Sequence, residues 1–269
     1  MLFKPKIAII GASYLQKPLV DRAKKMGVYT ICFAWEEGAV CKDVADEFYP
    51  ISVVEKEQIL SVSIEKQIDG ICTIASDVAA PTVAYVAEKM GLVGNSYDAA
   101  IRANNKYLMR QALSAAAIPC PFYKRITSFE QLDLKKLYFP VIVKPTDRSG
   151  SLGVSTADKK ERIQKAVENA LDCSFNHEAI VEEFIEGREI SVEFISYRGK
   201  HYPLQITDKV TTGPPHFVEL EHHQPADLTM EQYAQIYDLT KRALDALGVT
   251  NGASHSEYKI TEDGTICVM

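Results

Sequence analysis

A lysine followed by a loop of small residues is one feature of this sequence that could do chemistry. Lys144 follows the apolar run 141–143, and residues 147–153 read Asp-Arg-Ser-Gly-Ser-Leu-Gly. Glycines let a backbone fold closely over phosphate groups, serine hydroxyls can donate to phosphate oxygens, and the lysine supplies a point charge. The loop lacks the Gly-Lys-Ser/Thr ending of the common phosphate-binding loop. The residues therefore predict either a phosphate-binding loop or a flexible hairpin.

A run of acidic residues further along the chain offers a second kind of site. Residues 181–189 read Val-Glu-Glu-Phe-Ile-Glu-Gly-Arg-Glu. An apolar strand that ends in adjacent acids and a glycine turn is typical of an ordinary charged hairpin, which residue chemistry alone favours. Alternatively, an extended hinge could offer backbone groups and Glu182 to the edge of an adenine ring. Glu189 would then accept hydrogen bonds from ribose hydroxyls.

Metal ligands could come from the last third of the chain. Glu257 lies in the predicted strand 256–260, and a carboxylate there could hold Mg²⁺ together with substrate phosphates, although a solvated glutamate is the commoner case. His216, His222 and His223 lie close together in the sequence but lack the spacing of a transition-metal site. We expect a substrate-facing or merely polar loop around these histidines.

A strand-to-glycine turn near the start of the chain could present backbone N–H groups to a phosphate. Residues 7–13 read Ile-Ala-Ile-Ile-Gly-Ala-Ser. The dinucleotide fingerprint Gly-x-Gly-x-x-Gly is absent, because Ser13 stands in place of its second glycine. We therefore expect a structural turn, with a dinucleotide site of an NAD-dependent enzyme as the alternative.

The elements that must position these residues fall into two groups. In the first hundred residues, apolar β-branched runs alternate with amphipathic segments, which predicts a parallel sheet covered on both faces. The runs are 7–10, 29–33 and 70–74, and the amphipathic segments are 15–26, 54–66 and 79–90. After a helix-rich stretch, strands with few helices between them predict α+β structure. Those strands are expected at 139–145, 179–184, 189–197, 202–208 and 256–260, with helices at 159–173 and 230–247.

Composition argues against several classes of protein. The chain has 269 residues, of which 46% are hydrophobic, and a formal net charge of −6. An acidic surface suits neither nucleic acid nor an anionic membrane, so neither partner is expected. No stretch approaches the roughly 18 unbroken apolar residues of a membrane span, and no signal peptide is recognisable. The six cysteines include no Cys-x-x-Cys pair, which indicates reduced thiols in a cytoplasmic protein.

The order of these motifs resembles the ATP-grasp superfamily. The resemblance covers nearly the whole chain, including an N-terminal α/β unit similar to a preATP-grasp domain. Its motifs are Asn105-Lys106, the strand 139–145, the loop 147–153, the acidic run 181–189 and the strand 252–257. Within the superfamily the chain looks closest to the L-amino-acid ligase and carbamoyl-phosphate-synthase-like branch. The segments that indicate this branch are 75–77, 216–219 and 252–257.

This resemblance implies a role for each matching residue. Those that would bind ATP are Lys106, Lys144, Ser149, Gly150, Ser151, Gly153, Glu182, Glu183, Phe184, Ile185 and Glu189. Among them, the lysines would contact phosphates, residues 149–154 would form a lid over the triphosphate, and the hinge 183–185 would hold adenine beside Glu182. Those that would face the acceptor substrate are Asp208, Lys209, His216 and Glu219. Lys144 and Lys209 would be catalytic, and Glu257 would bind Mg²⁺, with Mn²⁺ as an alternative.

The resemblance further implies an ATP-dependent ligase that activates a carboxylate as an acyl phosphate and captures it with an amine, or with a thiol or other nitrogen. Its partners would be small-molecule carboxylates and amines, and dimers are usual in the resembling family. The family pattern continues with a Glu-x-Asn-x-Arg segment, whereas this sequence ends at Met269. We therefore expect a C-terminally truncated fragment of an enzyme, with a noncatalytic nucleotide-binding or interaction module as the alternative.

The expected fold class is α/β and α+β: a preATP-grasp, Rossmann-like domain followed by an ATP-grasp fold. Residues 1–95 would form the α/β domain, and residues 96–120 a helical connection. Residues 121–186 would form the lid subdomain, and residues 187–269 an incomplete C-terminal core.

Overall fold

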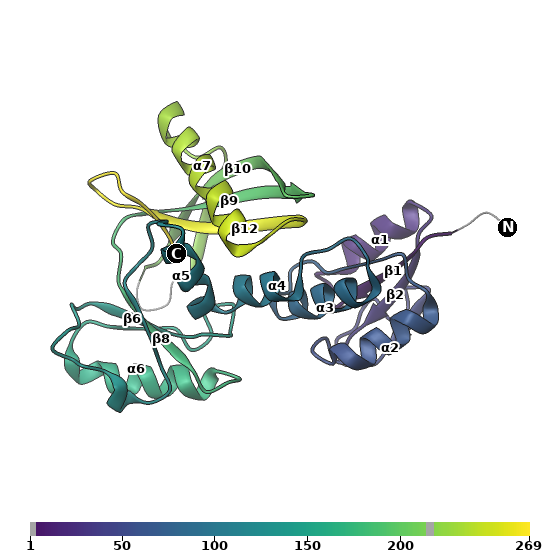
Figure 1. The fold of residues 1–269 in the computed structure, drawn as a ribbon, viewed down its shortest axis with the longest axis horizontal. Helices are drawn as coiled ribbons and strands as arrows, with labels where there is room; N and C mark the ends of the chain where they lie inside the picture. The colour runs from purple at the N-terminus through teal and green to yellow at the C-terminus, as the bar shows by residue number, and fades with distance from the viewer. Residues whose placement is uncertain (1–3, 214–217) are drawn as a thin grey trace. The chain divides into compact units, whose positions relative to one another are not determined.

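The computed structural model describes residues 4–213 and 218–269 (Figure 1). The chain folds as two compact units, residues 1–104 and residues 105–269. The boundary falls inside the segment 96–120 that the sequence analysis assigns to a helical connection, and the four-part division stays a prediction. Among the described residues, no helix combines the length and apolar character of a membrane span.

The first unit is built on a parallel sheet with the strand order β3-β2-β1-β4. Its strands are β1 (Lys6–Ile10), β2 (Tyr29–Phe33), β3 (Glu47–Tyr49) and β4 (Gly70–Cys72). Its helices are α1 (Lys17–Lys25), α2 (Lys56–Lys66), α3 (Ala80–Met90) and α4 (Tyr97–Asn104), with a 3-10 turn at Asp77–Ala79.

Helices cover both faces of this parallel sheet. Ile9 on β1 packs with Val20 of α1, whereas Ile10 packs with Ile59 of α2 and Val86 of α3 on the opposite face (Figure 1). Since both faces are buried, β1 and β2 read as continuous apolar runs rather than alternating ones. The predicted Rossmann-like unit is confirmed. The short edge strand β3 was not predicted, because three residues that include a glutamate carry little strand signal.

The second unit contains two antiparallel sheets. The smaller has the order β5-β8-β6-β7, and helix α6 packs on one of its faces through apolar residues such as Ile163 and Val167. Its elements are β5 (Tyr123–Ile126), β6 (Val141–Pro145), β7 (Ser155–Ala157), β8 (Ala179–Glu183) and α6 (Lys160–Cys173), with a 3-10 turn at Phe129–Gln131.

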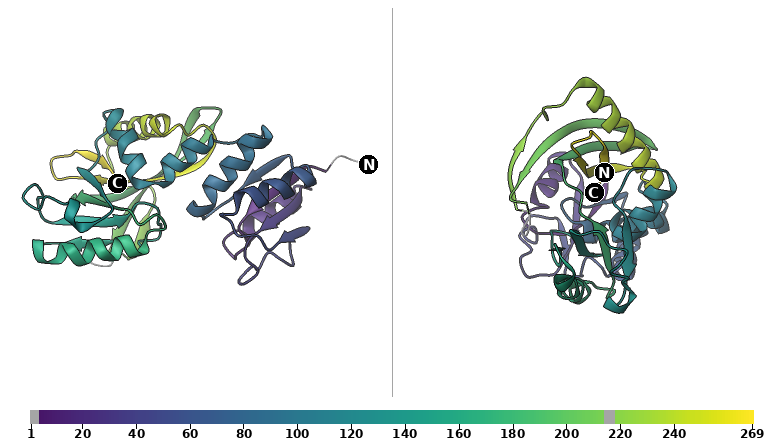
Figure 2. Two further views of the ribbon diagram at one scale, coloured as in Figure 1. Left: turned by 60° about the horizontal axis from the view of Figure 1, so that its bottom comes forward. Right: turned by 90° about the vertical axis from the view of Figure 1, so that its left-hand side faces the viewer.

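The larger sheet of the second unit has the order β11-β10-β9-β12-β13. Its elements are β9 (Arg188–Tyr197), β10 (Lys200–Thr211), β11 (Glu219–His223), β12 (Gly252–Ile260) and β13 (Ile266–Val268), accompanied by α5 (Lys106–Ala115) and α7 (Met230–Leu247). Figures 1 and 2 show α6 and α7 on the outer sides of their sheets.

Alternation along β9 separates a buried face from an open one. Ile190, Val192 and Phe194 are fully buried against α7 and its neighbours. The intervening residues, which include Glu189, lie on the opposite face, because successive side chains of a strand point to opposite sides. Strand β11 replaces the polar loop that the sequence predicted. All five of its residues are exposed, so its sequence has no apolar alternation to reveal it.

Candidate functional site

A buried ion-pair cluster joins three elements of the second unit. The Lys144 Nζ atom on β6 lies 2.7 Å from Oε2 of Glu182 on β8, and the Arg110 Nε atom on α5 lies 2.6 Å from Oε1 of the same carboxylate. Glu182 is the register partner of Ile142, two residues before Lys144, so the two side chains share one face of the sheet. We call Arg110, Glu182 and Lys144 the buried triad.

The electrostatics of the triad keep Glu182 ionised. Burial raises the pKa of Glu182, but Lys144 and Arg110 outweigh that effect and lower the pKa to about 2. The side chains of Arg110 and Glu182 are 1% and 0% exposed, whereas that of Lys144 is 13% exposed. Each Glu182 oxygen therefore already lies within ion-pair distance of a cation. Its adenine role stays a prediction.

The residue that sequence reasoning missed is Arg110. It is almost fully buried on α5, three positions before Leu113 in the hydrophobic core. A charged residue on the apolar stripe of an amphipathic helix was the available signal, since such a charge must find a buried partner.

Lys106 and the predicted lid loop are brought together. Asn105 caps the start of α5 by accepting from the backbone of Tyr107 at 3.0 Å. The Lys106 backbone N–H then donates to the Thr146 carbonyl at 2.9 Å, and its Nζ donates to the Arg148 carbonyl. Lys106 thus holds the start of the loop that follows Lys144.

The loop itself links β6 to β7, which pair as a hairpin. Asp147 ties its base to the end of α6 by accepting from Ser174 Oγ at 3.0 Å and from the Asn176 backbone at 2.9 Å. A Cβ at Gly153 would lie 2.7 Å from Pro145 Cγ and from Cys173 Cβ, so this glycine is required for close packing. The backbone of Gly153 also has a φ of +72°, which glycine adopts without strain. Ser149, Gly150 and Ser151 lie between these anchors.

The acidic run 181–189 does not form a hairpin. It contains the end of β8 and the start of β9, which belong to different sheets, so residues 184–187 connect the two sheets as a hinge. Glu183 anchors the hinge: its backbone N–H donates to the Phe122 carbonyl, and its Oε1 accepts from the Phe122 N–H, both at 3.0 Å. A Cβ at Gly187 would lie 2.4 Å from the Ile260 carbonyl oxygen, which explains the glycine.

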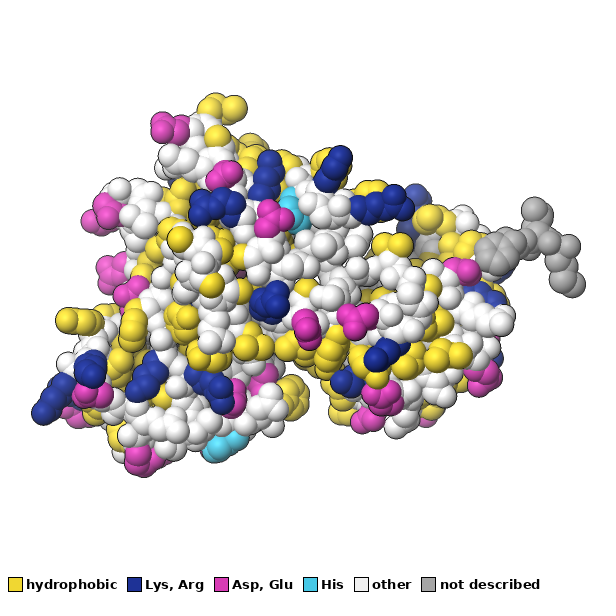
Figure 3. All heavy atoms as spheres, viewed as in Figure 1, with side chains coloured by type: hydrophobic (Ala, Val, Ile, Leu, Met, Phe, Trp, Pro, Cys, Tyr) yellow, Lys and Arg dark blue, Asp and Glu magenta, His cyan; other side chains and the backbone are white. Residues whose placement is uncertain are grey.

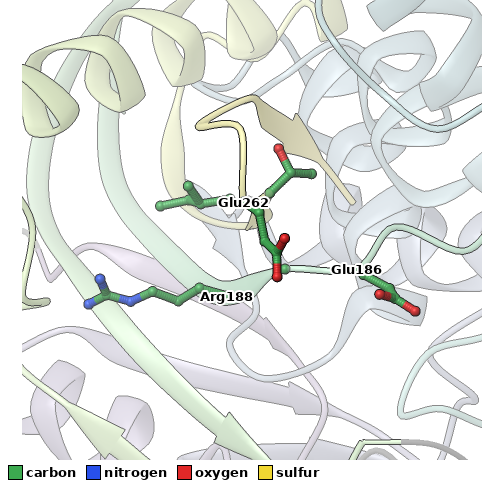
Figure 4. A pocket seen from close by; sticks show the side chains of 6 residues that line it. Glu186, Arg188 and Glu262 are labelled. Atoms are coloured by element: carbon green, nitrogen blue, oxygen red, sulfur yellow. The ribbon is translucent and has the colours of Figure 1, made fainter.

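A cavity of about 480 Å³ borders this hinge. Figure 4 shows Glu186 and Glu262 at its lining, with Arg188 extending away from Glu186. The Arg188 Nε atom lies 2.6 Å from Oδ1 of Asp208, which occupies that guanidinium. None of the residues predicted to bind ATP line this cavity. Glu186 and Glu262 have no ion-pair partner within residues 4–213 and 218–269, and the arginine beside them is neutralised, so this cavity is a poor phosphate site.

A second charge cluster lies on the open face of the larger sheet. The Lys209 Nζ atom lies 2.7 Å from Glu219 Oε1 and 3.4 Å from Glu189 Oε1, and it also donates to Glu257. Lys209 and Glu189 are register partners on β10 and β9, and the other two carboxylates come from β11 and β12. We call these four residues the open-face cluster. The structure thus brings together four of the predicted site residues.

Lys209 is held as an ammonium inside this cluster. Burial lowers its pKa, but hydrogen bonds to Glu219 and Glu257 outweigh burial and raise it. His255, whose Nε2 atom lies 3.8 Å from Glu257 Oε1, and Lys209 lower the pKa of Glu257 to about 2 against the effect of burial. His255 in turn contacts Glu193 Oε1 at 3.0 Å through Nδ1. Sequence reasoning assigned neither His255 nor Glu193 a role.

One predicted acceptor-side residue, Asp208, lies away from the open-face cluster. Asp208 precedes Lys209 on β10, so its side chain lies on the other face of the sheet. There it pairs with Arg188 and accepts from the Asp227 N–H at 2.9 Å. His216 lies outside the described residues.

Glu257 suits a hard divalent cation that shares its ligands with a nucleotide. Its side chain is 44% exposed, and Mg²⁺ at phosphate sites takes one or two carboxylates while phosphates and water complete the shell. Across residues 4–213 and 218–269, no group of three or more His, Cys, Asp or Glu side chains could hold a metal ion. The donor set fits a metal completed by phosphate oxygens rather than a closed protein cage.

The glycine turn after β1 is filled from within the first unit. The Gln16 Oε1 atom accepts from the Ser13 N–H at 3.1 Å and from Ser13 Oγ at 2.7 Å, while Gln16 Nε2 donates to the Ile74 carbonyl at 2.6 Å. A Cβ at Gly11 would meet Gln16 at 2.9 Å. This arrangement supports a structural turn, because Gln16 occupies the space over the glycine.

Comparison with known proteins identifies the second unit. Residues 137–269 match the family model described as the ATP-grasp domain. The chain contains an ATP-grasp domain. It is 30% identical over 231 residues to alanine–anticapsin ligase of Bacillus subtilis (strain 168), covering 77% of this chain and 48% of that protein. It is 29% identical over 194 residues to D-alanine–D-alanine ligase of Geotalea uraniireducens (strain Rf4), covering 68% of this chain and 60% of that protein.

Solved structures share the fold of both units. The L-amino acid ligase from Bacillus licheniformis superposes with a TM-score of 0.84 at 24% identity, covering 100% of this chain and 66% of that one. An ADP complex of N5-carboxyaminoimidazole ribonucleotide synthetase gives 0.83 at 20% identity, covering 99% and 70%. The predicted fold class, an α/β unit followed by an ATP-grasp fold, is confirmed. This ATP-grasp chain spans about half the length of the first relative.

Proposed function

We propose that this ATP-grasp chain is the nucleotide-binding part of a ligase that joins a small carboxylate to an amine with ATP. The observation that carries the proposal is the convergence of two lysines on one loop. Lys144 lies two positions before Thr146 in the chain. Lys106 donates to the carbonyls of Thr146 and Arg148. Two cations beside a glycine- and serine-containing loop form the environment that a polyphosphate requires.

The nucleotide would extend from the loop to the hinge between the two sheets. Its phosphates would contact Lys106, Lys144 and the lid residues Ser149, Gly150, Ser151 and Gly153. Adenine would lie against the hinge residues Glu183, Phe184 and Ile185, beside Glu182. Glu189, the second residue of β9 after the hinge, would accept from the ribose hydroxyls. A hinge that joins two sheets can hold a planar base between them.

The open-face cluster would form the acceptor side. Glu257 would hold Mg²⁺ or Mn²⁺, which when bound neutralises phosphate charge. Glu219 would contact the acceptor substrate there, and so would His216, which lies outside the described residues. Asp208 is not included, because it pairs with Arg188 on the other face of the sheet. Lys209, already held as a cation among carboxylates, would orient a substrate carboxylate or the transferred phosphate. The names of the relatives, alanine–anticapsin ligase and D-alanine–D-alanine ligase, support small amino acids as substrates.

The proposed chemistry needs positioning and charge neutralisation rather than a protein nucleophile. A substrate carboxylate oxygen attacks the γ-phosphorus of ATP, the bond to the bridging oxygen breaks, and ADP leaves. The amine then attacks the carbonyl carbon of the acyl phosphate, and phosphate departs with the C–O bond electrons. Lys144 and Lys209 would act on the donor and acceptor sides respectively. The expected homodimer and cytoplasmic location stay predictions.

Titration calorimetry with ATP and MgCl₂ tests the nucleotide site. We expect wild type to bind ATP and Lys144→Ala to bind it at least about ten-fold more weakly, the effect of losing one charge-assisted contact. Glu182 keeps Arg110 as a counter-ion in that variant, so the fold should persist. Lys136→Ala is the matched control, because the Lys136 side chain is 82% exposed. Equal affinity of wild type and Lys144→Ala would overturn the proposal.

The noncatalytic nucleotide-binding module is the second candidate. The three carboxylates around Lys209 favour it, because they already neutralise the cation proposed for the acceptor side. An assay of ADP release with amino acid pairs separates the two: a nucleotide-binding module binds ATP, yet it releases no ADP with any pair.

A further inference from the structure

The buried triad contains one more positive charge than negative charge. Arg110 and Lys144 each contribute one cation, and both pair with the single carboxylate of Glu182. Arg110 is the deepest cation, with a side chain 1% exposed, while Lys144 reaches the surface. Solvent exposure therefore increases across the triad, from a fully enclosed arginine to a lysine that a ligand can reach.

This difference in exposure between the two cations determines whether Lys144 can change partners. A buried carboxylate without a counter-ion is strongly disfavoured, so a lysine that was its sole partner would stay bound to it. An arginine keeps its charge at every physiological pH. Because Arg110 remains paired with Glu182, Lys144 can turn toward another anion without leaving the carboxylate unpaired.

Stability alone does not account for Arg110. A buried ion pair contributes no more to folding than well-packed apolar residues of similar volume. Moreover, the buried Arg110 Nη1 atom has no hydrogen-bond partner among the described residues, and an unsatisfied buried donor is itself destabilising. The arginine engages Glu182 through Nε only. These features indicate a role other than stabilisation.

We propose that Arg110 is a positioning residue for the triphosphate: as the permanent counter-ion of Glu182, it allows Lys144 to exchange that carboxylate for a phosphate group. The inference rests on the proposed function, since it requires that Lys144 bind a nucleotide phosphate. It assigns a task to a residue that itself touches no ligand.

The test compares ATP with adenosine, which lacks phosphates, on the full chain. In Arg110→Met, Lys144 is the sole counter-ion of Glu182. ATP affinity should therefore fall by about ten-fold or more, the scale of one charge-assisted contact, while adenosine affinity changes less than about two-fold. In the double variant Arg110→Met/Glu182→Gln, Lys144 has no carboxylate to hold it, and the ratio of ATP to adenosine affinity should recover. The ratio is the readout because any adenine contact of Glu182 is lost equally for both ligands. Arg125→Met is the matched control, because Arg125 pairs with Glu178 at the surface.

Each outcome is decisive. Parallel losses of ATP and adenosine affinity, or no recovery in the double variant, would show that Arg110 serves structure only and would overturn the inference. Unchanged ATP affinity in Arg110→Met would overturn it as well. If Arg110→Met does not fold, as judged by circular dichroism, Arg110→Lys against the double variant carries the same comparison: the lysine variant should retain the wild-type ratio of ATP to adenosine affinity. Failure of wild type to bind either ligand would instead overturn the proposed function.

Discussion

The two lysines predicted to be catalytic lie in opposite electrostatic surroundings. In the buried triad, Lys144 and Arg110 share one carboxylate, so cations exceed anions. In the open-face cluster, Lys209 faces the carboxylates of Glu189, Glu219 and Glu257. Lys259 adds a second lysine 3.4 Å from Glu189 Oε2, so the three carboxylates still outnumber the lysines. The buried triad therefore has an excess of positive charge that can attract an anion. The open-face cluster has an excess of negative charge that can attract a cation.

The two clusters also differ in how many carboxylates pair with each lysine. Lys209 is only 2% exposed, and three carboxylates hold it, whereas Lys144 has one carboxylate that a second cation already neutralises. We infer that Lys144 is the lysine that changes partners when nucleotide binds and that Lys209 stays in place. This division suits a ligase, in which polyphosphate and divalent metal must occupy neighbouring but distinct sites.

The largest expected effect comes from removing the carboxylate of the buried triad. Glu182→Gln leaves two enclosed cations without an anion, and we expect the free energy of unfolding at neutral pH to fall by about 3–5 kcal/mol. Urea unfolding measures it. Glu178→Gln, which breaks the surface pair with Arg125, should cost at most about 1 kcal/mol. Equal losses in the two variants would contradict the distinction between enclosed and surface pairs.

The same variant predicts a pH dependence. Because the pKa of Glu182 is lowered from 4.5 to about 2 on folding, its ionisation stabilises the native state above pH 4.5, and that stabilisation is lost as the pH falls from 4.5 toward 2. The difference in unfolding free energy between wild type and Glu182→Gln should therefore be constant near neutrality and shrink across this interval. A difference that persists unchanged down to a pH of about 2 would contradict the assignment.

A smaller effect is expected where the open-face cluster meets the nucleotide. Glu189→Ala should weaken ATP binding by about 1–2 kcal/mol, the value of a hydrogen bond to a charged group. Calorimetry measures the affinity of wild type and Glu189→Ala for ATP and for 2′,3′-dideoxy-ATP. The substitution should not weaken binding of the dideoxy nucleotide, because that nucleotide has no ribose hydroxyls for Glu189 to contact. If the substitution weakens both ligands equally, the ribose contact lies elsewhere.

The smallest effect concerns the competition between Lys209 and a metal. Lys209→Met removes the lysine that contacts all three carboxylates, while Lys259 stays beside Glu189. Glu219 and Glu257 are about half exposed and can relax into water. We expect Mn²⁺ affinity without nucleotide to rise by about five-fold, or ~1 kcal/mol. Electron paramagnetic resonance of free Mn²⁺ measures it, with Lys200→Met, at the other end of β10, as the control. Unchanged Mn²⁺ affinity would contradict the claim that the open-face cluster has excess negative charge where the buried triad has excess positive charge.

Much of the fold was predictable because its signals are local. Helix α7 has an amphipathic sequence and a Thr229–Gln232 capping box at its start, which mark it in any context. Among the strands that escaped prediction, β3 is short and β11 is fully exposed, so neighbouring strands rather than their own side chains determine them. The pairing partners of β8 and β9 cannot be read from their own side chains either. The hinge after Glu183 was therefore indistinguishable from a hairpin until the structure placed these two strands in different sheets.

The candidate site divides in the same way. The residue types and order along the chain determined the ATP-grasp resemblance, the lysines at 106 and 144, and the carboxylates at 189 and 257. Only the tertiary structure decided their partners: that Arg110 reaches Glu182, that Lys209 lies among three acids, and that Asp208 faces away from them. A sequence specifies which side chains are charged. Which charges meet, and how far from water, depends on strand register and helix packing between segments far apart in the chain.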